Sequence, residues 1–232
     1  MKNTAAFRRM AGAVALVATA LLMVVSVVLA PEFPRGFTDR LTAVDEGGTS
    51  AAVSAVTFAL AQLPFIVGAL AIGHLVRDRA PVLSNVGTSL AVLGGFGHSV
   101  FGGISMAMLA MAADAPNRAV HADLLEQIES GPAAVFMAMG LLGTVSGLLL
   151  LGLGLFRTRM VPRWVPIMLW AFLAVEFAGS ALSEWASLVS GLLYLVALAG
   201  IAVAVWRSPI SSWETRSVAS RVTPEPRTAN PS

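Results

Sequence analysis

The sequence has no cysteine and few charged residues. Of its 232 residues, 12% are charged and 56% are hydrophobic. Soluble domains usually carry about 25% charged residues, so a water-soluble fold of this length could not hide so much apolar surface. The absence of cysteine excludes disulfides, thiolate metal sites and thiol chemistry. Lys2 is the only lysine, so the cationic chemistry is almost entirely that of arginine.

Several sequence motifs typical of soluble enzymes are also missing. The sequence has no phosphate-binding loop, zinc-protease motif or serine-nucleophile motif. The glycine string at Gly94–Gly97 lies inside a hydrophobic stretch, where a phosphate loop would not form. The pI of about 9.9 would suit nucleic acid. The arginines, however, lie in short loops beside apolar runs, so no nucleic-acid partner is expected.

Long apolar stretches are what the sequence has in abundance. A helix needs about 20 apolar residues to cross a bilayer. Six stretches qualify: Met10–Ala30, Ala51–Leu75, Val82–Ala113, Pro132–Phe156, Trp164–Leu182 and Ala186–Trp206. We therefore predict an all-α, polytopic transmembrane helix bundle of about six spans over residues 1–207. A five-span alternative, with a broken hairpin around Ser183, Glu184 and Trp185, would place the tail outside.

The first stretch has features of a cleaved signal peptide. Lys2, Arg8 and Arg9 form a charged start, and residues 28–30, Val-Leu-Ala, resemble a cleavage site. Pro31 would directly follow the cleavage site, which is unfavourable for cleavage. The apolar run is also longer than that of a usual signal peptide. We therefore favour an uncleaved first span.

Cations are distributed unequally between the two sides of the predicted bundle. The N-terminus, the second and fourth connections and the tail together carry 12 cations. The other side carries three, Arg35, Arg40 and Arg118. Because cation-rich loops face the cytoplasm, both termini are expected to be cytoplasmic, in a multi-pass protein of a bacterial cytoplasmic (inner) membrane.

The two outer loops contain amphipathic patterns. Apolar residues recur at helical spacing in both: Phe33, Phe37, Leu41 and Val44 in the first, and Val120, Leu124, Leu125 and Ile128 in the second. Each set alternates with acidic residues, which predicts a short amphipathic helix on the outer surface in each loop. These helices would either cover the top of the bundle or form a lid over an outward cavity.

The last residues differ in composition from the rest. From Ser208 the sequence is rich in Ser, Thr, Pro and Arg. Such a segment cannot bury enough apolar surface to order itself. We therefore predict a disordered cytoplasmic tail over residues 208–232.

Polar side chains are few inside the predicted spans. Glu176 is the only formal charge deep within one, about 18 Å from Trp164 by helical rise. An ionised carboxylate at that depth is costly, so Glu176 should be neutral, paired or facing water. The other candidates at comparable depth are Gln62, His98, Ser99, Thr144 and Ser180.

His98 is the expected partner of Glu176. It lies within about one helical turn of Glu176 in depth, so we predict that the two face each other across the third and fifth spans. The pair would reduce the cost of burying the carboxylate. It would be either a proton-handling or substrate site, or a structural interhelical hydrogen bond.

No cofactor and no metal are expected. His74 and His98 could serve as axial haem ligands, but they fall at opposite levels of the bundle. Met106, Met108 and Met111 could bind soft copper, although three methionines in an apolar stretch are typical of core packing.

The turn from Arg157 to Trp164, Arg-Thr-Arg-Met-Val-Pro-Arg-Trp, joins two apolar helices. It resembles a turn in uncharacterised six- or seven-span membrane protein families of actinobacterial-type, arginine-rich proteomes. The resemblance extends to most of the span layout. It implies no known reaction, so it assigns no catalytic residue.

These features favour a non-enzymatic integral membrane protein that scaffolds, regulates or associates with other envelope components. The alternative is a small permease or proton-coupled transporter that uses the polar site around His98 and Glu176. An intramembrane enzyme is a third hypothesis, for which too few polar residues converge. The expected partners are the lipid bilayer and either another membrane protein or a second copy of this chain.

Overall fold

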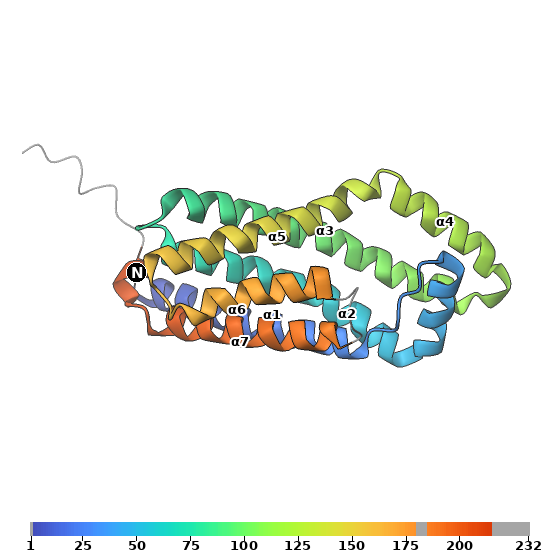
Figure 1. Cartoon of the computed structure of the whole chain (residues 1–232), viewed down its shortest axis with the longest axis horizontal. Coiled ribbons are helices and arrows are strands. Elements are labelled where there is room, and N and C mark those ends of the chain that lie inside the picture. The colour runs from blue at the N-terminus through green and yellow to red at the C-terminus, as the bar shows by residue number, and fades with distance from the viewer. Residues whose placement is uncertain (1, 180–184, 215–232) are drawn as a thin grey trace, which may run out of the picture.

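Long apolar runs separated by short polar turns become long helices in this chain (Figure 1). The fold comes from a computed structural model, which describes residues 2–179 and 185–214. That part of the chain is helical and contains no strand. The helices are α1 (Lys2–Leu29), α2 (Phe37–Val76), α3 (Pro81–Ala113), α4 (Arg118–Ser130), α5 (Ala133–Thr158), α6 (Trp164–Ala174) and α7 (Ala186–Arg207). Three short elements complete them: the 3-10 turns η1 (Ala115–Asn117) and η3 (Ile210–Trp213), and the π-helical segment η2 (Val175–Gly179).

Five helices, α1, α2, α3, α5 and α7, are long and apolar enough to cross a membrane. They match five of the six predicted spans in length and apolar composition. The sixth, predicted over Trp164–Leu182, is a shorter apolar helix over Trp164–Ala178. The turn predicted around Ser183 and Glu184 lies outside the described residues. An apolar helical bundle of this kind is compatible with a multi-pass integral membrane protein.

Successive long helices run in opposite directions, which brings distant parts of the chain together (Figure 1). The start of α1 and the end of α7 lie at one end of the bundle, where the Arg9 guanidinium donates to the Ser208 carbonyl over 2.8 Å. We call this the inner end. Helix α4 lies at the opposite end, which we call the outer end.

The first outer-loop helix and the second span are two helical parts joined at a kink. Both lie within α2, Phe37–Val76, whose backbone is not helical at Gly48; the sequence predicted a separate loop helix and a span from Ala51. The two parts meet at Gly48, whose φ of 47° lies in a region that favours glycine. The bend at Gly48 lets the first part of α2 lie over the outer end while the second part enters the bundle.

Part of the predicted tail belongs to the bundle. The prediction placed disorder from Ser208, but η3 folds back on the inner end and Trp213 is only 4% exposed. The Trp213 ring stacks on His74 at 4.1 Å, and its indole N–H donates to Ser208 Oγ over 2.8 Å. Burial of this one indole orders the segment even though the residues around it are polar. Residues 215–232 lie outside the described part.

Glycines bring α3 and α5 into backbone contact. A Cβ built on Gly97 would lie 2.5 Å from the Phe136 carbonyl, and one on Gly143 would lie 2.7 Å from the Gly94 nitrogen. Such contacts are possible only without side chains, and small residues commonly permit them between membrane helices. Gly143 and Gly147, a G-x-x-x-G pair in the sequence, thus pack against α3 within the bundle.

Buried side chains form two separate cores. The larger one fills the bundle toward the inner end and includes Val76, Leu155 and Val205, each with no exposed surface. The smaller one lies beneath α4 at the outer end and is centred on Leu41 and Leu125. The candidate site lies between these two cores.

Candidate functional site

Two neighbouring cavities lie between the inner and outer cores. The outer cavity has a volume of about 470 Å³ and the inner one about 160 Å³. Met23, Phe58 and Glu176 line both, so the cavities meet at these side chains. Most of the lining is apolar, with Ser26, Ser54, Ser105 and the ion pair Arg40–Glu129 as polar groups in the outer cavity. The resulting space runs from the outer end into the middle of the bundle.

Glu176 lies in the π-helical segment η2, directly after α6. A π turn inserts an extra residue into a helix and changes the direction of the side chains beside it, and such turns are frequent at functional sites. Here the carboxylate reaches α7 and accepts a hydrogen bond from Ser190 Oγ. The carboxylate therefore has a polar partner in an otherwise apolar region.

The Ser190 hydroxyl has a second acceptor, the Ser187 carbonyl, at 2.9 Å. A hydroxyl carries one proton, so it can donate to only one of these oxygens at a time. When Glu176 is ionised, Ser190 can donate to the carboxylate. When Glu176 is protonated, its own O–H can donate to Ser190 Oγ, which frees the hydroxyl proton for Ser187. The arrangement satisfies Glu176 in both protonation states.

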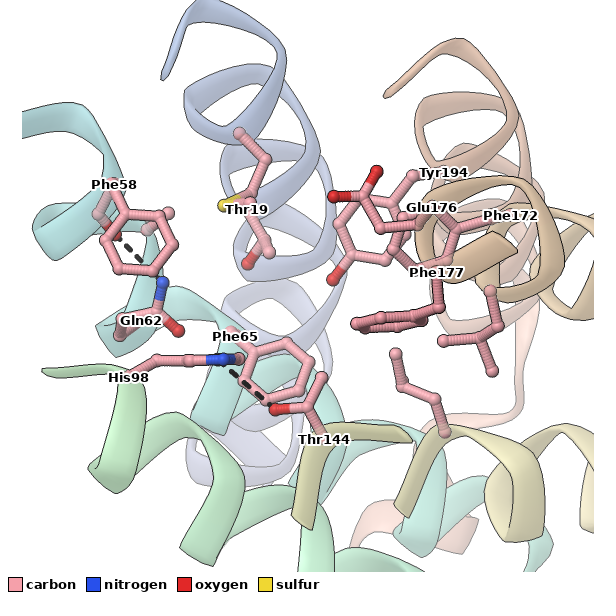
Figure 2. Close-up of a pocket in the computed structure, with 14 residues that line it drawn as sticks. Thr19, Phe58, Gln62, Phe65, His98, Thr144, Phe172, Glu176, Phe177 and Tyr194 are labelled. Atoms are coloured by element: carbon pink, nitrogen blue, oxygen red, sulfur yellow. Dashed lines mark hydrogen bonds between the residues drawn. The ribbon is translucent and has the colours of Figure 1, made fainter. Parts of the chain in front are cut away.

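The opposite wall of the inner cavity carries His98, Thr144 and Gln62 (Figure 2). Thr144 Oγ1 lies 3.3 Å from His98 Nδ1, and the His98 ring meets Phe58 edge-on at 5.8 Å. Gln62 is buried and donates to the Phe58 carbonyl over 2.9 Å. The close approach of α3 to α5 is what places His98 beside Thr144.

His98 and Glu176 do not form the direct pair that their depths predicted. Each binds another residue, Thr144 for His98 and Ser190 for Glu176. The reason lies in the packing: α3 lies against α2 and α5, whereas α6 and η2 lie against α7. The two side chains consequently approach the cavity from opposite sides (Figure 2).

Four of the six predicted site residues line the same cavity: Gln62, His98, Thr144 and Glu176. Ser99 instead donates to the Gly95 carbonyl of its own helix over 2.8 Å. Ser180 lies outside the described residues. Depth along the spans therefore correctly predicted four of the residues that line this cavity.

Three polar residues of the site were missed by the sequence analysis. Thr19 and Tyr194 line the inner cavity, and Ser190 binds Glu176. Tyr194 is the only tyrosine of the chain and lies inside the last apolar stretch, so a search for every polar group within the spans would have found it. Ser190 would also have been found in this way, but its role depends on the contact between η2 and α7.

Ion pairs hold the outer end together around the mouth of the outer cavity. Arg40 of α2 binds Glu129 of α4 at 2.7 Å, and both side chains are largely buried. Arg118 binds Asp45 at 2.6 Å, which is a second link between α4 and α2. Hydrogen bonds from His121 and Asn117 lower the pKa of Asp114, which keeps this carboxylate ionised beside them. The segments over the cavity are therefore joined by polar links at its rim.

Among residues 2–179 and 185–214, no group of three or more acidic, histidine or cysteine side chains could hold a metal ion. Comparison of the chain with protein-family models, with curated proteins and with solved structures gives no match.

Proposed function

We propose that this chain is a proton-coupled permease that takes up small, mainly apolar molecules with a cationic group from the outer side of a bacterial cytoplasmic membrane. The observation that carries the proposal is the pair of joined cavities that meets at Glu176. A cavity of about 470 Å³ has the size typical of sites for small organic ligands. Its apolar walls suit a hydrocarbon or aromatic body, and the carboxylate suits a positive charge.

The inner end of the bundle supports an outward-facing state. Below the inner cavity, α2, α5, α6 and α7 share a tightly packed core with fully buried residues such as Leu151, Val165 and Ile201. The outer cavity instead reaches Arg40 and Glu129 at the rim. The site is thus closed toward the inner end, and its approach is from the outer end past the α2–α4 ion pairs.

The two hydrogen-bonding states of Glu176 suggest how a proton would be coupled to a ligand. In an apolar cavity a carboxyl group is satisfied either as the neutral acid or beside a cation. A cationic ligand favours the ionised carboxylate, because an opposite charge stabilises it. Binding of the cation would release the Glu176 proton, and Ser190 would hold the carboxylate in place throughout.

The proposed orientation has both termini in the cytoplasm. Most arginines of the described part lie at the inner end, in the turns after α2 and α5 and near both chain ends: Arg8, Arg9, Arg77, Arg79, Arg157, Arg159, Arg163 and Arg207. At the outer end, Arg40 and Arg118 are each paired with an acid. The larger number of arginines at the inner end favours its placement in the cytoplasm.

Ligand binding can be tested with ethidium, a fluorescent aromatic cation, and Nile red, a neutral aromatic dye. We expect purified protein in detergent to bind ethidium and release protons into a weakly buffered solution. Glu176→Gln should weaken ethidium binding at least about tenfold and abolish the proton release, because loss of a charged partner is worth about 1.5–3 kcal/mol. Nile red binding should change little.

Glu126→Gln is the matched control, since Glu126 is an exposed acid of α4 away from the cavities. It removes the same charge and should leave ethidium binding unchanged. In proteoliposomes, an imposed pH gradient should drive ethidium movement in the wild type and not in Glu176→Gln. Equal ethidium affinity in the wild type and Glu176→Gln would reject the proposal and favour a scaffolding role.

A further inference from the structure

Two apolar grooves on the surface of the bundle converge on a single arginine near the inner end. One groove, of about 670 Å³, lies between α1 and α7. The other, of about 690 Å³, lies between α7 and the beginning of α6. Ala199, Val203 and Arg207 of α7 line both grooves. These three residues therefore form a ridge with an apolar groove on each side and a cation at its inner end.

The longer groove extends along about one membrane leaflet. From Arg207 to Val196, the farthest α7 residue in the second groove, α7 rises about 16 Å. The hydrocarbon core of a bilayer is about 30 Å thick, so this distance corresponds to roughly half of it. The groove between α1 and α7 is shorter, about 12 Å from Arg207 to Ala199. The two grooves on either side of one ridge suit the two acyl chains of a phospholipid.

The inner end of the ridge is positively charged. Arg207 is exposed and takes part in none of the ion pairs formed within residues 2–179 and 185–214. A second cation lies close by, because the Arg9 guanidinium is 5.8 Å from the ring of Trp206. Trp206 itself is 54% exposed, as expected for a tryptophan at the level of lipid headgroups.

We propose that this surface binds one anionic phospholipid of the cytoplasmic leaflet. The lipid phosphate lies at Arg207 and Arg9, and the acyl chains occupy the two grooves beside Ala199 and Val203. Basic pockets between helices on the cytoplasmic side are a known mode of recognition for anionic headgroups. The site is independent of the cavities around Glu176, although its leaflet follows from the proposed orientation.

Native mass spectrometry of the purified protein in detergent tests the proposal, with phosphatidylglycerol and phosphatidylcholine of identical acyl chains as probes. We expect preferential retention of phosphatidylglycerol. Arg207→Gln should lower its affinity about fivefold, since one basic residue contributes about 1 kcal/mol to the binding of anionic lipid. Arg157→Gln is the control, because Arg157 is an exposed cation at the same end that lines neither groove.

A second variant tests the grooves separately from the charge. Ala199→Phe places a ring on the ridge and should reduce phosphatidylglycerol binding while Arg207 remains; an unchanged melting temperature shows that the bundle is intact. Glycerol phosphate, a headgroup without chains, should not compete at equal concentration. Equal retention of the two lipids, equal effects of Arg207→Gln and Arg157→Gln, or full competition by glycerol phosphate would each overturn the proposal.

Discussion

At the scale of single residues, the environment of Glu176 decides what this acid can do. It is held by Ser190 of α7, and Ser190 can exchange donor and acceptor roles through the Ser187 carbonyl. A carboxylate with one adaptable partner can gain or lose a proton without leaving a buried polar group unpaired. A rigid pair with a permanent cation would instead keep the carboxylate ionised.

The first prediction concerns the Glu176–Ser190 contact. Glu176→Gln should be mild for stability, because the amide can still hydrogen-bond to Ser190. A double-mutant cycle with Glu176→Leu and Ser190→Ala should give a coupling of about 1 kcal/mol in the free energy of unfolding in detergent, as is usual for hydrogen bonds between membrane helices. The same cycle with His98→Ala should give a coupling near zero. A larger coupling to His98 than to Ser190 would contradict the geometry.

At the scale of elements, the contact between α3 and α5 positions one wall of the site. Gly97 of α3 faces the backbone of Phe136 and Gly140 of α5. This contact brings His98 within 3.3 Å of Thr144. Any side chain at Gly97 must separate the two helices and move both polar residues of the cavity wall.

The second prediction compares two glycines of α3. Gly97→Ala should lower the free energy of unfolding by about 1–3 kcal/mol, because the new methyl group meets backbone atoms that cannot move aside alone. Gly103→Ala is the control, since a Cβ there has nothing within 4 Å, and it should change stability by less than about 0.5 kcal/mol. Denaturant unfolding in mixed micelles measures both. Similar losses for the two variants would show that the α3–α5 contact is looser than described.

The third prediction concerns η3, which ties the inner ends of α1, α2 and α7 together. Trp213 stacks on His74, and Arg77 donates to the Ser212 carbonyl over 2.9 Å. Trp213→Ala should cost about 3 kcal/mol, in the range found for buried tryptophans. Truncation after Trp213 should leave the melting temperature in detergent unchanged, because it keeps these contacts. A large loss on truncation would place further stabilising contacts in residues 214–232.

At the scale of the whole molecule, charge distinguishes the two ends. The inner end carries most arginines of the described part, around the helix turns, whereas the outer end carries ion pairs between α2 and α4. Because cationic loops are usually retained in the cytoplasm, this asymmetry favours the proposed orientation, with the inner end in the cytoplasm. In that orientation the mouth of the outer cavity lies on the side opposite the cytoplasm.

The fourth prediction is the topology. A reporter active only in the cytoplasm should be active when fused after Ser232, and a reporter active only in the periplasm should be active when inserted within Asp114–Ser130. Both results are expected because the start of α1 and the end of α7 lie at one end of the bundle and α4 lies at the other (Figure 1). If each reporter is active only at the other position, the orientation is the reverse of the one proposed. If the tail and α4 both lie outside, the chain has five spans.

The sequence by itself determined the helical class, five of the spans and the depth of the polar residues. These properties are one-dimensional, because the length of an apolar run and the position of a residue along a helix can be counted. Composition did not predict that Trp213 packs on the bundle, because that depends on a single tertiary contact. The break between the first outer helix and the second span lies at the glycines, where the backbone of Gly48 is not helical.

Only the tertiary structure decided which polar residues meet. His98 and Glu176 have similar depths, yet a helix can turn a residue toward any neighbour, and depth does not specify that rotation. The rotation of α3 follows from the glycine contact with α5, which directs His98 to Thr144. The π turn after α6 directs Glu176 to Ser190. The site thus depends on how helix faces pack, and that packing arises from many contacts that no single stretch of sequence contains.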